Sequence, residues 1–139
     1  MSWITEVIEG KHAHIGVLAL RLVVGLAFVL HGIGKWSNIA GTSHFFTSLF
    51  GGLGPVLAYY VATVEVLGGL ALIVGLGTRI AGLLMAVNMA VVVLYVKWSK
   101  GFVGGFELEL TFLAASLFFI FHGPGKYSLE KVFKLKHAF

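Results

Sequence analysis

Four long apolar runs dominate the hydrophobic pattern of this chain. Each approaches the ~20 residues that a helix needs to cross a ~30 Å hydrocarbon layer. Their apolar positions are continuous rather than alternating, which argues against a β-barrel. The pattern therefore predicts an all-α integral membrane protein, a four-helix bundle forming one domain over residues 1–139. The predicted transmembrane helices cover residues 15–36, 55–77, 79–97 and 104–122.

Shorter amphipathic stretches lie before, between and after these runs. Residues 1–14 carry Trp3 and Ile8 on one side of a short helix, which predicts an interfacial helix at the membrane surface. The segment Ser37–Gly54 is polar and Gly-rich but contains several phenylalanines, so it is expected to lie on the surface as a half-helix or to dip in as a lid. The basic tail Lys126–Phe139 is expected at the lipid headgroups.

The basic residues predict the topology. With four spans, both termini and the loop between the second and third spans share one side of the membrane. That side carries Lys11, Arg79, Lys126, Lys131, Lys134 and Lys136, whereas the other side carries Lys35, Lys97 and Lys100. Because the more basic side usually faces the cytoplasm, both termini are predicted to be cytoplasmic. The segment Ser37–Gly54 then faces outward.

Composition excludes some chemistries. The chain is 58% hydrophobic and only 12% charged, and it contains no cysteine. It therefore cannot itself form a disulfide, a thiolate metal site or a cysteine-held iron–sulfur cluster, so any electron carrier must be a bound cofactor, a substrate or a partner. The net charge of +4 comes from lysines that flank the spans, which predicts the lipid bilayer rather than nucleic acid as the partner.

Haem and metal ions are not expected either. His31 and His122 should lie near opposite faces of the membrane, so they cannot be two axial ligands of one haem. No HxxH or HxxxH pair is present to suggest a metal site.

Ionisable side chains inside the spans are the candidate functional residues. Arg21, His31 and Lys35 fall on one stripe of the first predicted helix, together with Val24 and Phe28. A charged side chain at the bilayer centre costs about 2.5–3.5 kcal/mol on insertion scales, so such groups rarely face lipid. This stripe is therefore expected to face the interior of the bundle.

The direction of helical side chains predicts how these groups pair. Side chains lean toward the N-terminus of their own helix, which brings His31 toward Glu65 and Lys35 toward Glu107. We therefore predict a polar site in the outer half of the bundle built from these four residues. Arg21 leans the other way, toward the cytoplasmic headgroups. Because the arginine side chain is long, an Arg21–Glu65 ion pair is a competing arrangement.

Some alternatives stay open at this level. Glu107 and Glu109 are two residues apart, about 200° around a helix, so they cannot both face the site. Asn88 is the polar residue within the third span, and it is expected to support the site alongside Arg21. The whole set could instead be structural, with paired groups that fix the helix register. The functional reading is a binding or proton-handling site for a small amphipathic molecule, for which histidine is well suited.

The polar residues and glycines together resemble the DoxX/DoxD-like family of small bacterial and archaeal membrane proteins. The matching elements are Arg21-Leu22, Gly25, Phe28, His31-Gly32 and Lys35; Glu65, Gly68-Gly69, Leu72 and Gly75; Gly101-Phe102 and Gly104-Gly105-Phe106-Glu107; and Gly123-Pro124-Gly125-Lys126-Tyr127-Ser128-Leu129. The resemblance covers about residues 16–130. It departs at Ser128-Leu129-Glu130, where relatives often carry aspartate.

The resemblance implies a four-helix bundle in the bacterial or archaeal cytoplasmic (inner) membrane, and it favours Glu107 over Glu109 as the inward carboxylate. Some family members are subunits of quinone-linked enzymes such as thiosulfate:quinone oxidoreductase, and others are associated with oxidative-stress complexes. Quinone is therefore the candidate cofactor, with His31 and Glu65 or Glu107 bonding its carbonyl groups and moving protons. Lys35 would hold the carboxylates ionised.

Two other functions compete with the redox subunit. One is a non-catalytic membrane scaffold or assembly protein, which the absence of cysteine favours. The other is a small-solute or proton pathway, which four short helices could form only as an oligomer. Gly82, Ala86 and Ala90 repeat at a spacing that lets helices pack closely in lipid. That stripe suits packing within the bundle or a homo-oligomer, and other protein subunits are the remaining expected partners.

Overall fold

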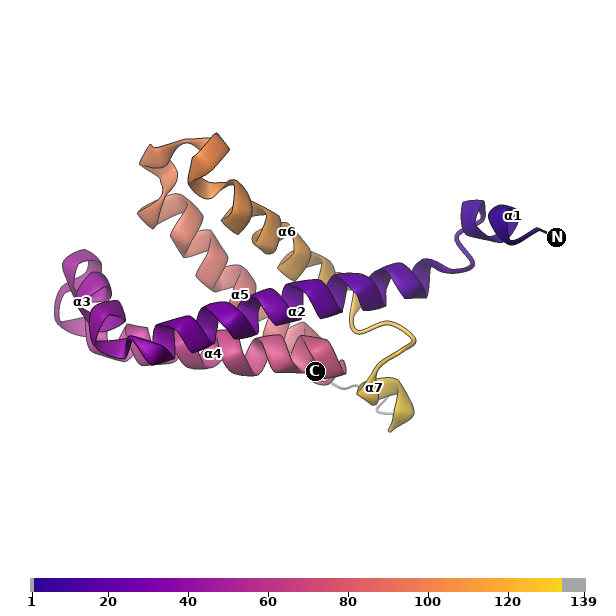
Figure 1. The fold of residues 1–139 in the computed structure, drawn as a ribbon, viewed down its shortest axis with the longest axis horizontal. Helices are drawn as coiled ribbons and strands as arrows, with labels where there is room; N and C mark the ends of the chain where they lie inside the picture. Colours follow the sequence, from indigo (N-terminus) through magenta and orange to yellow (C-terminus); the bar gives the residue numbers. More distant parts are fainter. Residues whose placement is uncertain (1, 134–139) are drawn as a thin grey trace.

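The computed structural model describes residues 2–133, and these are helical with no strand among them. The helices are α1 (Trp3–Ile8), α2 (Ala13–Ser37), α3 (Ile39–Phe50), α4 (Gly54–Val74), α5 (Thr78–Val91), α6 (Glu107–His122) and α7 (Leu129–Val132) (Figure 1). A 3₁₀ turn (Gly51–Leu53) joins α3 to α4, and a π-helical turn (Val92–Val96) extends α5. Another 3₁₀ turn (Trp98–Lys100) and π-helical turn (Phe102–Phe106) precede α6.

Four of these helical stretches are long and apolar enough to cross a membrane: Ala13–Ser37, Ile39–Val74, Thr78–Val96 and Phe102–His122. The predicted all-α, four-helix membrane class is therefore confirmed. The helix ends differ from the predicted ones by only a few residues. Gly75 and Gly123 end α4 and α6, and Gly77 directly precedes α5, all three with positive φ angles.

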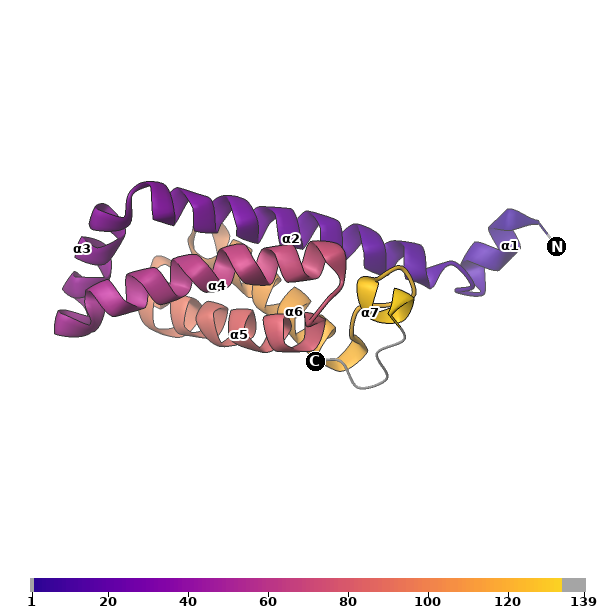
Figure 2. The ribbon, with the colours of Figure 1, turned by 90° about the horizontal axis from the view of Figure 1, so that it is seen from below.

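The long helices form two antiparallel pairs, α2 with α4 and α5 with α6, and α4 also contacts α5. Figure 1 shows that the two pairs converge toward the end that carries α1 and α7, and diverge toward the end that carries α3. Figure 2 shows α2 and α4 running side by side, with α5 and α6 beyond them. We call the end that carries α1 and α7 the terminal end of the bundle, and the end that carries α3 the α3 end.

Glycine allows α2 and α4 to touch along their backbones. A Cβ atom on Gly69 would lie 2.6 Å from the Gly25 carbonyl oxygen, and one on Gly32 would lie 2.8 Å from the Val66 nitrogen. Such close approach is how helices associate in lipid, where burial of apolar surface cannot drive them together. Gly82 does the same between α5 and α6, where its Cβ would lie 2.9 Å from the Ser116 carbonyl oxygen. Gly82, the first of the small residues repeated at four-residue spacing, thus allows close packing of α5 and α6 within the bundle.

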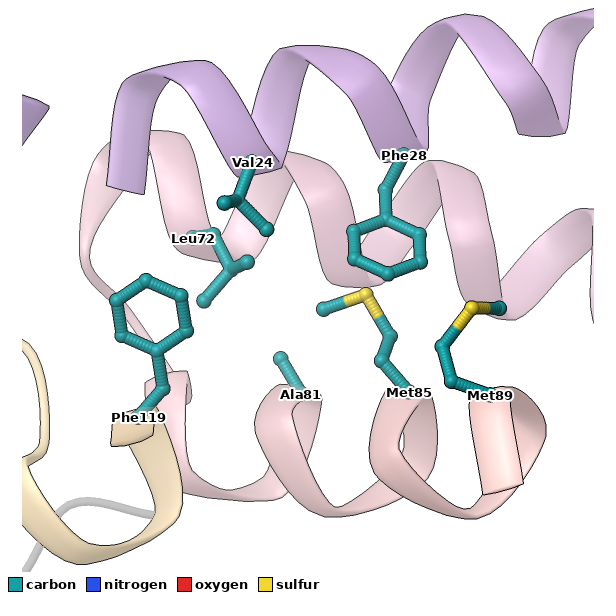
Figure 3. Packing of buried hydrophobic residues seen from close by; sticks show 7 residues of the cluster. All are labelled: Val24, Phe28, Leu72, Ala81, Met85, Met89 and Phe119. Atoms are coloured by element: carbon teal, nitrogen blue, oxygen red, sulfur yellow. The ribbon is translucent and has the colours of Figure 1, made fainter. Parts of the chain in front are cut away.

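The apolar core lies between the two helix pairs. It contains Val24, Phe28, Leu72, Ala81, Met85, Met89 and Phe119, which converge from all four long helices (Figure 3). Val24 and Phe28 belong to the predicted inward stripe of α2 and are buried. The core fills the space where the pairs are close, and it ends toward the α3 end, where they separate.

Arg21 closes the terminal end. Its side chain is only 2% exposed. The guanidinium donates four hydrogen bonds to backbone carbonyl oxygens, those of Leu72 (2.7 Å), Ile73 (3.0 Å), Pro124 (2.8 Å) and Tyr127. The Arg21 side chain points toward the terminal end, as expected. Its guanidinium bonds backbone carbonyl oxygens of the protein, however, rather than lipid headgroups. The competing Arg21–Glu65 ion pair does not form.

A second buried charge completes this end. Glu130, 4% exposed, accepts a hydrogen bond from the backbone nitrogen of Thr78 at 3.2 Å, at the first turn of α5. A carboxylate is stabilised there by the free N–H groups and the dipole of the helix. The Glu130 nitrogen also donates to the Gly75 carbonyl oxygen at 3.1 Å, so the segment after α6 is fastened to the α4–α5 turn. Of the tail expected at the headgroups, residues 134–139 lie outside the described residues.

The N-terminal helix α1 extends away from the bundle (Figure 1). It exposes Trp3, Ile4, Val7 and Ile8, the apolar face expected of an interfacial helix. At the opposite end α3 packs mainly against α4. The segment Ser37–Gly54 thus forms a helix, as both expected arrangements require, and its place on the membrane surface or as a lid stays a prediction.

Candidate ligand-binding pocket

A pocket of about 660 Å³ occupies the α3 end, where the two helix pairs diverge. Its volume lies within the usual range of about 300–1,000 Å³ for small-molecule sites. The walls are largely apolar and aromatic and come from α2, α3, α4, α6 and the α5 region. The aromatic residues among them are Phe28, Phe45, Phe46, Phe50, Tyr60 and Phe112.

One ion pair lies on the α2–α4 side of the pocket. Lys35 Nζ donates to Glu65 Oε2 at 2.7 Å, and Glu65 is only 3% exposed. The predicted partners were His31 for Glu65 and Glu107 for Lys35, so both pairings were wrong. Gly32 packs against Ala62 and Val66, which places Glu65 about level with residue 31. The long lysine stem folds back one turn to reach the carboxylate.

His31 lies at the edge of the pocket rather than on the carboxylate. Its side chain is exposed, and its ring is edge-on to Phe112 of α6, with 6.3 Å between the ring centroids. The same ring also borders a shallow hollow with Ala27 and Leu30 on the outer face of α2. His31 therefore lies where the pocket meets the exposed surface of α2.

A second ion pair lies on the α5–α6 side, between Lys97 and Glu109. Both residues line the pocket. The expectation that Glu107 is the inward carboxylate was therefore wrong. Glu107 is exposed, lies outside the pocket and accepts a hydrogen bond from the Gly104 nitrogen at 3.1 Å.

The rotation of α6 explains this difference. Phe112, Ser116 and Phe119 turn toward the core or the pocket, and Glu109 continues their 3-4-3 spacing toward the start of the helix. Glu107 falls on the opposite side. Glu109 could have been recognised from this spacing, whereas Lys97 gave no signal beyond its place at the end of an apolar run.

Asn88 and Glu109 each present an atom without a hydrogen-bond partner. Three buried side-chain atoms of the described residues lack one: Thr78 Oγ1, Asn88 Nδ2 and Glu109 Oε2. Asn88 is only 8% exposed, and both it and Glu109 line the pocket. Buried polar atoms are nearly always paired, so two unpaired atoms at one cavity indicate a place where a ligand can bond.

The α3 helix covers the pocket at the α3 end of the bundle. It contributes Gly41, Thr42 and three phenylalanines to the lining. Its C-terminal turn rests on the π-helical turn after α5, where Phe50 stacks on Tyr95 with 5.2 Å between ring centroids. The Tyr95 hydroxyl donates to the Leu49 carbonyl oxygen at 3.4 Å. π-Helical turns are common at functional sites, and this one also supplies Val92 and Val96 to the pocket.

Within residues 2–133, no group of three or more histidine and acidic side chains could hold a metal ion. The pocket is instead suited to an amphipathic organic molecule, with aromatic walls for its apolar part and buried polar groups for its oxygen atoms.

The sequence comparisons agree with this architecture. The DoxX family model matches residues 16–98, more than half of the chain. The chain belongs to the DoxX family. It is 35% identical over 127 residues to "Putative oxidoreductase CatD" of Bacillus subtilis, with 91% of this chain and 93% of that protein covered.

Other family relatives are also membrane proteins or uncharacterised. The chain is 27% identical over 129 residues to "Inner membrane protein YqjF" of Escherichia coli, covering 91% of this chain and 98% of that protein. It is 32% identical over 123 residues to an uncharacterised protein of Haemophilus influenzae, covering 82% and 87%. No solved structure matches the chain significantly.

Proposed function

We propose that this DoxX protein is the membrane subunit of a bacterial or archaeal redox complex and that it binds a quinone in the pocket at the α3 end. The observation that carries the proposal is the unpaired donor of Asn88 and the unpaired acceptor of Glu109, both buried beside one aromatic-walled cavity. The relative named as an oxidoreductase supports the same class of chemistry.

The residues present fit a quinone. Its flat ring suits the aromatic walls at Phe28 and Phe112, whose ring centroids are 5.0 Å apart. A quinone supplies two-electron, two-proton chemistry when it is bound. The chain itself supplies donors, from the amide of Asn88 and the ammonium groups of Lys35 and Lys97. Carboxylate oxygens supply the acceptors.

The two ion pairs place proton-accepting groups at the cavity. Glu65 faces it from α4 and Glu109 from α6, and each has one oxygen bonded to a lysine. The remaining oxygen of each carboxylate is left to accept a proton or a hydrogen bond. His31, at the pocket edge beside the hollow on the outer face of α2, is the group positioned to exchange protons there.

The pocket is further proposed to open toward the outer half of the membrane, with both termini cytoplasmic. Its position at the end opposite α1 and α7, together with the greater number of basic residues at the terminal end, supports this orientation. Partner subunits would supply the electron carrier that the cysteine-free chain does not hold itself.

The quinone content of the mildly extracted protein tests the proposal. An organic extract is measured by ultraviolet absorbance before and after borohydride reduction, for wild type, Asn88→Leu and Glu107→Gln. We expect near-stoichiometric quinone in wild type and in Glu107→Gln, whose changed side chain lies outside the pocket, and little in Asn88→Leu. Wild-type protein free of quinone, and unable to bind added quinone or quinol, would refute the proposal and favour a scaffold or assembly role.

A further inference from the structure

The pocket reaches the outer face of α5. Leu83, Val87 and Val91 follow one another at four-residue spacing, so they lie on one face of the helix, and all three are exposed. Leu83 lies outside the pocket, which identifies this face as the outward one, whereas Val87 and Val91 line the pocket. The pocket therefore extends past the interior of the bundle to the outward side of α5.

The neighbouring helix α4 shows the same arrangement. Val56, Tyr60 and Leu67 share one face of α4, at spacings of four and seven residues, and all three are exposed. Val56 and Leu67 lie outside the pocket, but Tyr60 lines it. The pocket thus reaches the outward face of α4 as well.

These two outward sites lie on either side of one gap. The helices α4 and α5 touch at Gly68, where a Cβ atom would lie 3.3 Å from the sulfur atom of Met85. Beyond that contact the helix pairs diverge toward the α3 end (Figure 1). Val61 lies two turns from Gly68 on the same side of α4, Asn88 lies one turn from Met85 on α5, and both line the pocket. The pocket therefore continues between α4 and α5 from the interior to the exposed faces of both helices.

We call this passage the α4–α5 gap, and its lining is apolar or aromatic. It is lined by Leu57, Tyr60 and Val61 of α4 and by Val87, Val91 and Val92 of the α5 region. The ionisable residues of the pocket lie on α2, on α6, after α5 and, for Glu65, on the buried side of α4. A molecule with a polar ring and a hydrocarbon tail would therefore find polar partners inside the pocket and an apolar passage leading outward.

The other two ways out of the pocket are closed by aromatic contacts. At the α3 end, Phe50 of α3 stacks on Tyr95. Between α2 and α6, the rings of His31 and Phe112 meet edge-on, with 6.3 Å between their centroids, and the charged Lys35 lies one turn farther along. A hydrocarbon chain leaving by either route would have to separate rings that are in contact.

We infer that the α4–α5 gap opens the pocket sideways to the hydrocarbon of the membrane and holds the tail of the bound ligand. This inference rests on the proposed function and deepens it by naming the ligand class, a quinone with a long hydrocarbon tail that enters from the bilayer. Both exposed faces lie within stretches long and apolar enough to span a membrane, Ile39–Val74 and Thr78–Val96, so the opening meets lipid.

A photoreactive ligand tests the inference on the wild-type chain. The probe is decylubiquinone with a diazirine midway along its alkyl tail, irradiated with the full chain in phospholipid nanodiscs, and labelled peptides are identified by mass spectrometry. We expect label on α4 and α5 around Tyr60 and Val91, and excess decylubiquinone should remove it by competition. Competed label on α2 or α6 instead, or none on α4 and α5, would overturn the inference.

A matched pair of variants tests the gap by a second measurement. The affinities of decylubiquinone and of its tail-free ring, dimethoxy-methyl-benzoquinone, are measured in nanodiscs by calorimetry. In Val91→Trp we expect the ratio of the two affinities to fall at least ~5-fold, because overpacking of the gap displaces the tail. Leu83→Trp makes a similar change two turns away on the same exposed face, outside the pocket, and should keep the wild-type ratio.

The outcomes separate this inference from the proposed function. An unchanged ratio in Val91→Trp would remove the tail site from the α4–α5 gap, while binding of decylubiquinone to wild type would leave the proposed function standing. Failure of wild type to bind either probe would refute the proposed function and the inference together. The photolabelling needs no variant, so it decides the matter if Val91→Trp does not fold.

Discussion

The two ends of the bundle bury charged groups in opposite ways. At the terminal end the Arg21 guanidinium is enclosed by four carbonyl oxygens, and Glu130 bonds the start of α5. At the α3 end two ion pairs face a cavity, and Asn88 and Glu109 keep one unpaired atom each. A fully paired buried charge fixes structure, whereas an incompletely paired one leaves bonding capacity for a ligand.

The packing of apolar side chains also differs between the two ends of the bundle. Core side chains such as Leu72 and Phe119 fill the space between the helix pairs toward the terminal end, and both are fully buried (Figure 3). Toward the α3 end the pairs diverge and the core gives way to the 660 Å³ pocket. The terminal end therefore provides the stability that allows the other end to remain open.

The largest expected effect comes from breaking the terminal end. Arg21→Met roughly keeps the size of the side chain but leaves four backbone carbonyl oxygens without their hydrogen-bond donor. We expect a loss of about 3 kcal/mol or more in the free energy of unfolding. Thermal unfolding in detergent measures it. The matched control is Arg79→Met, since Arg79 is exposed and bonds only the Ile120 and Phe121 carbonyls. Equal losses in the two variants would contradict the structural role of Arg21.

The next effect comes from separating α2 and α4 near the pocket. In Gly32→Ala the new Cβ would lie 2.8 Å from the Val66 backbone nitrogen, so the helices must move apart. Overpacking of this kind costs about 1–3 kcal/mol, and it should also disturb the Lys35–Glu65 pair nearby. Gly34→Ala is the control, because a Cβ there has no neighbour within 4 Å. The midpoint temperature of thermal unfolding should fall for Gly32→Ala only. Identical melting curves for the two variants would contradict the close backbone contact between α2 and α4.

A smaller effect on stability, opposite in sign to the two losses above, is expected when Asn88, whose amide nitrogen is unpaired, is replaced. Asn88→Leu removes a buried donor that has no partner, so stability should stay the same or rise by about 1 kcal/mol while quinone binding is lost. Thr78→Val removes the unpaired hydroxyl at the terminal end and should have the same effect on stability without loss of quinone. The two variants are compared by thermal unfolding and quinone content. A strongly destabilised Asn88→Leu protein would show that Asn88 has a structural role.

The last prediction changes no stability and assigns the two ends to the two sides of the membrane. Because the chain has no cysteine, single cysteines can be introduced without background labelling. Ser48→Cys on α3 should react with a membrane-impermeant maleimide in intact spheroplasts, and Ser2→Cys beside α1 only after the membrane is permeabilised. The reverse pattern would place the pocket on the cytoplasmic side.

The sequence predicted the fold class better than the site. Apolar runs of membrane-spanning length predicted four helices, because in hydrocarbon only a helix or a closed barrel satisfies the backbone groups, and continuous apolar runs do not suit a barrel. The predicted inward stripe of α2 was correct for Arg21, Val24 and Phe28, which are buried, since that face depends on helical periodicity alone. Farther along the same stripe Lys35 is half-buried and His31 is exposed, so the stripe was only partly correct there. The pairings of Lys35 and Glu65 depend on how neighbouring helices slide and rotate, and they were predicted incorrectly.

The choice between Glu107 and Glu109 shows the same limit. The chain breaks its helical geometry just before α6, with Val103 extended (ψ 123°) and Gly104 at a positive φ of 71°. The rotation of α6 therefore does not follow from α5 and is set by packing of Phe112, Ser116 and Phe119. Resemblance to the family favoured Glu107, whereas the packing turns Glu109 to the pocket.

The sequence by itself thus determined that this protein is a membrane-spanning helical bundle with ionisable groups on its inner faces. Those features follow from hydropathy and from the fixed geometry of one helix. Only the tertiary structure decided which charges meet, where the two helix pairs separate, and that Asn88 and Glu109 keep unpaired atoms at one cavity. The reason is physical: partner choice depends on distances of a few ångströms between helices, set by the glycine contacts of α2 with α4 and of α5 with α6.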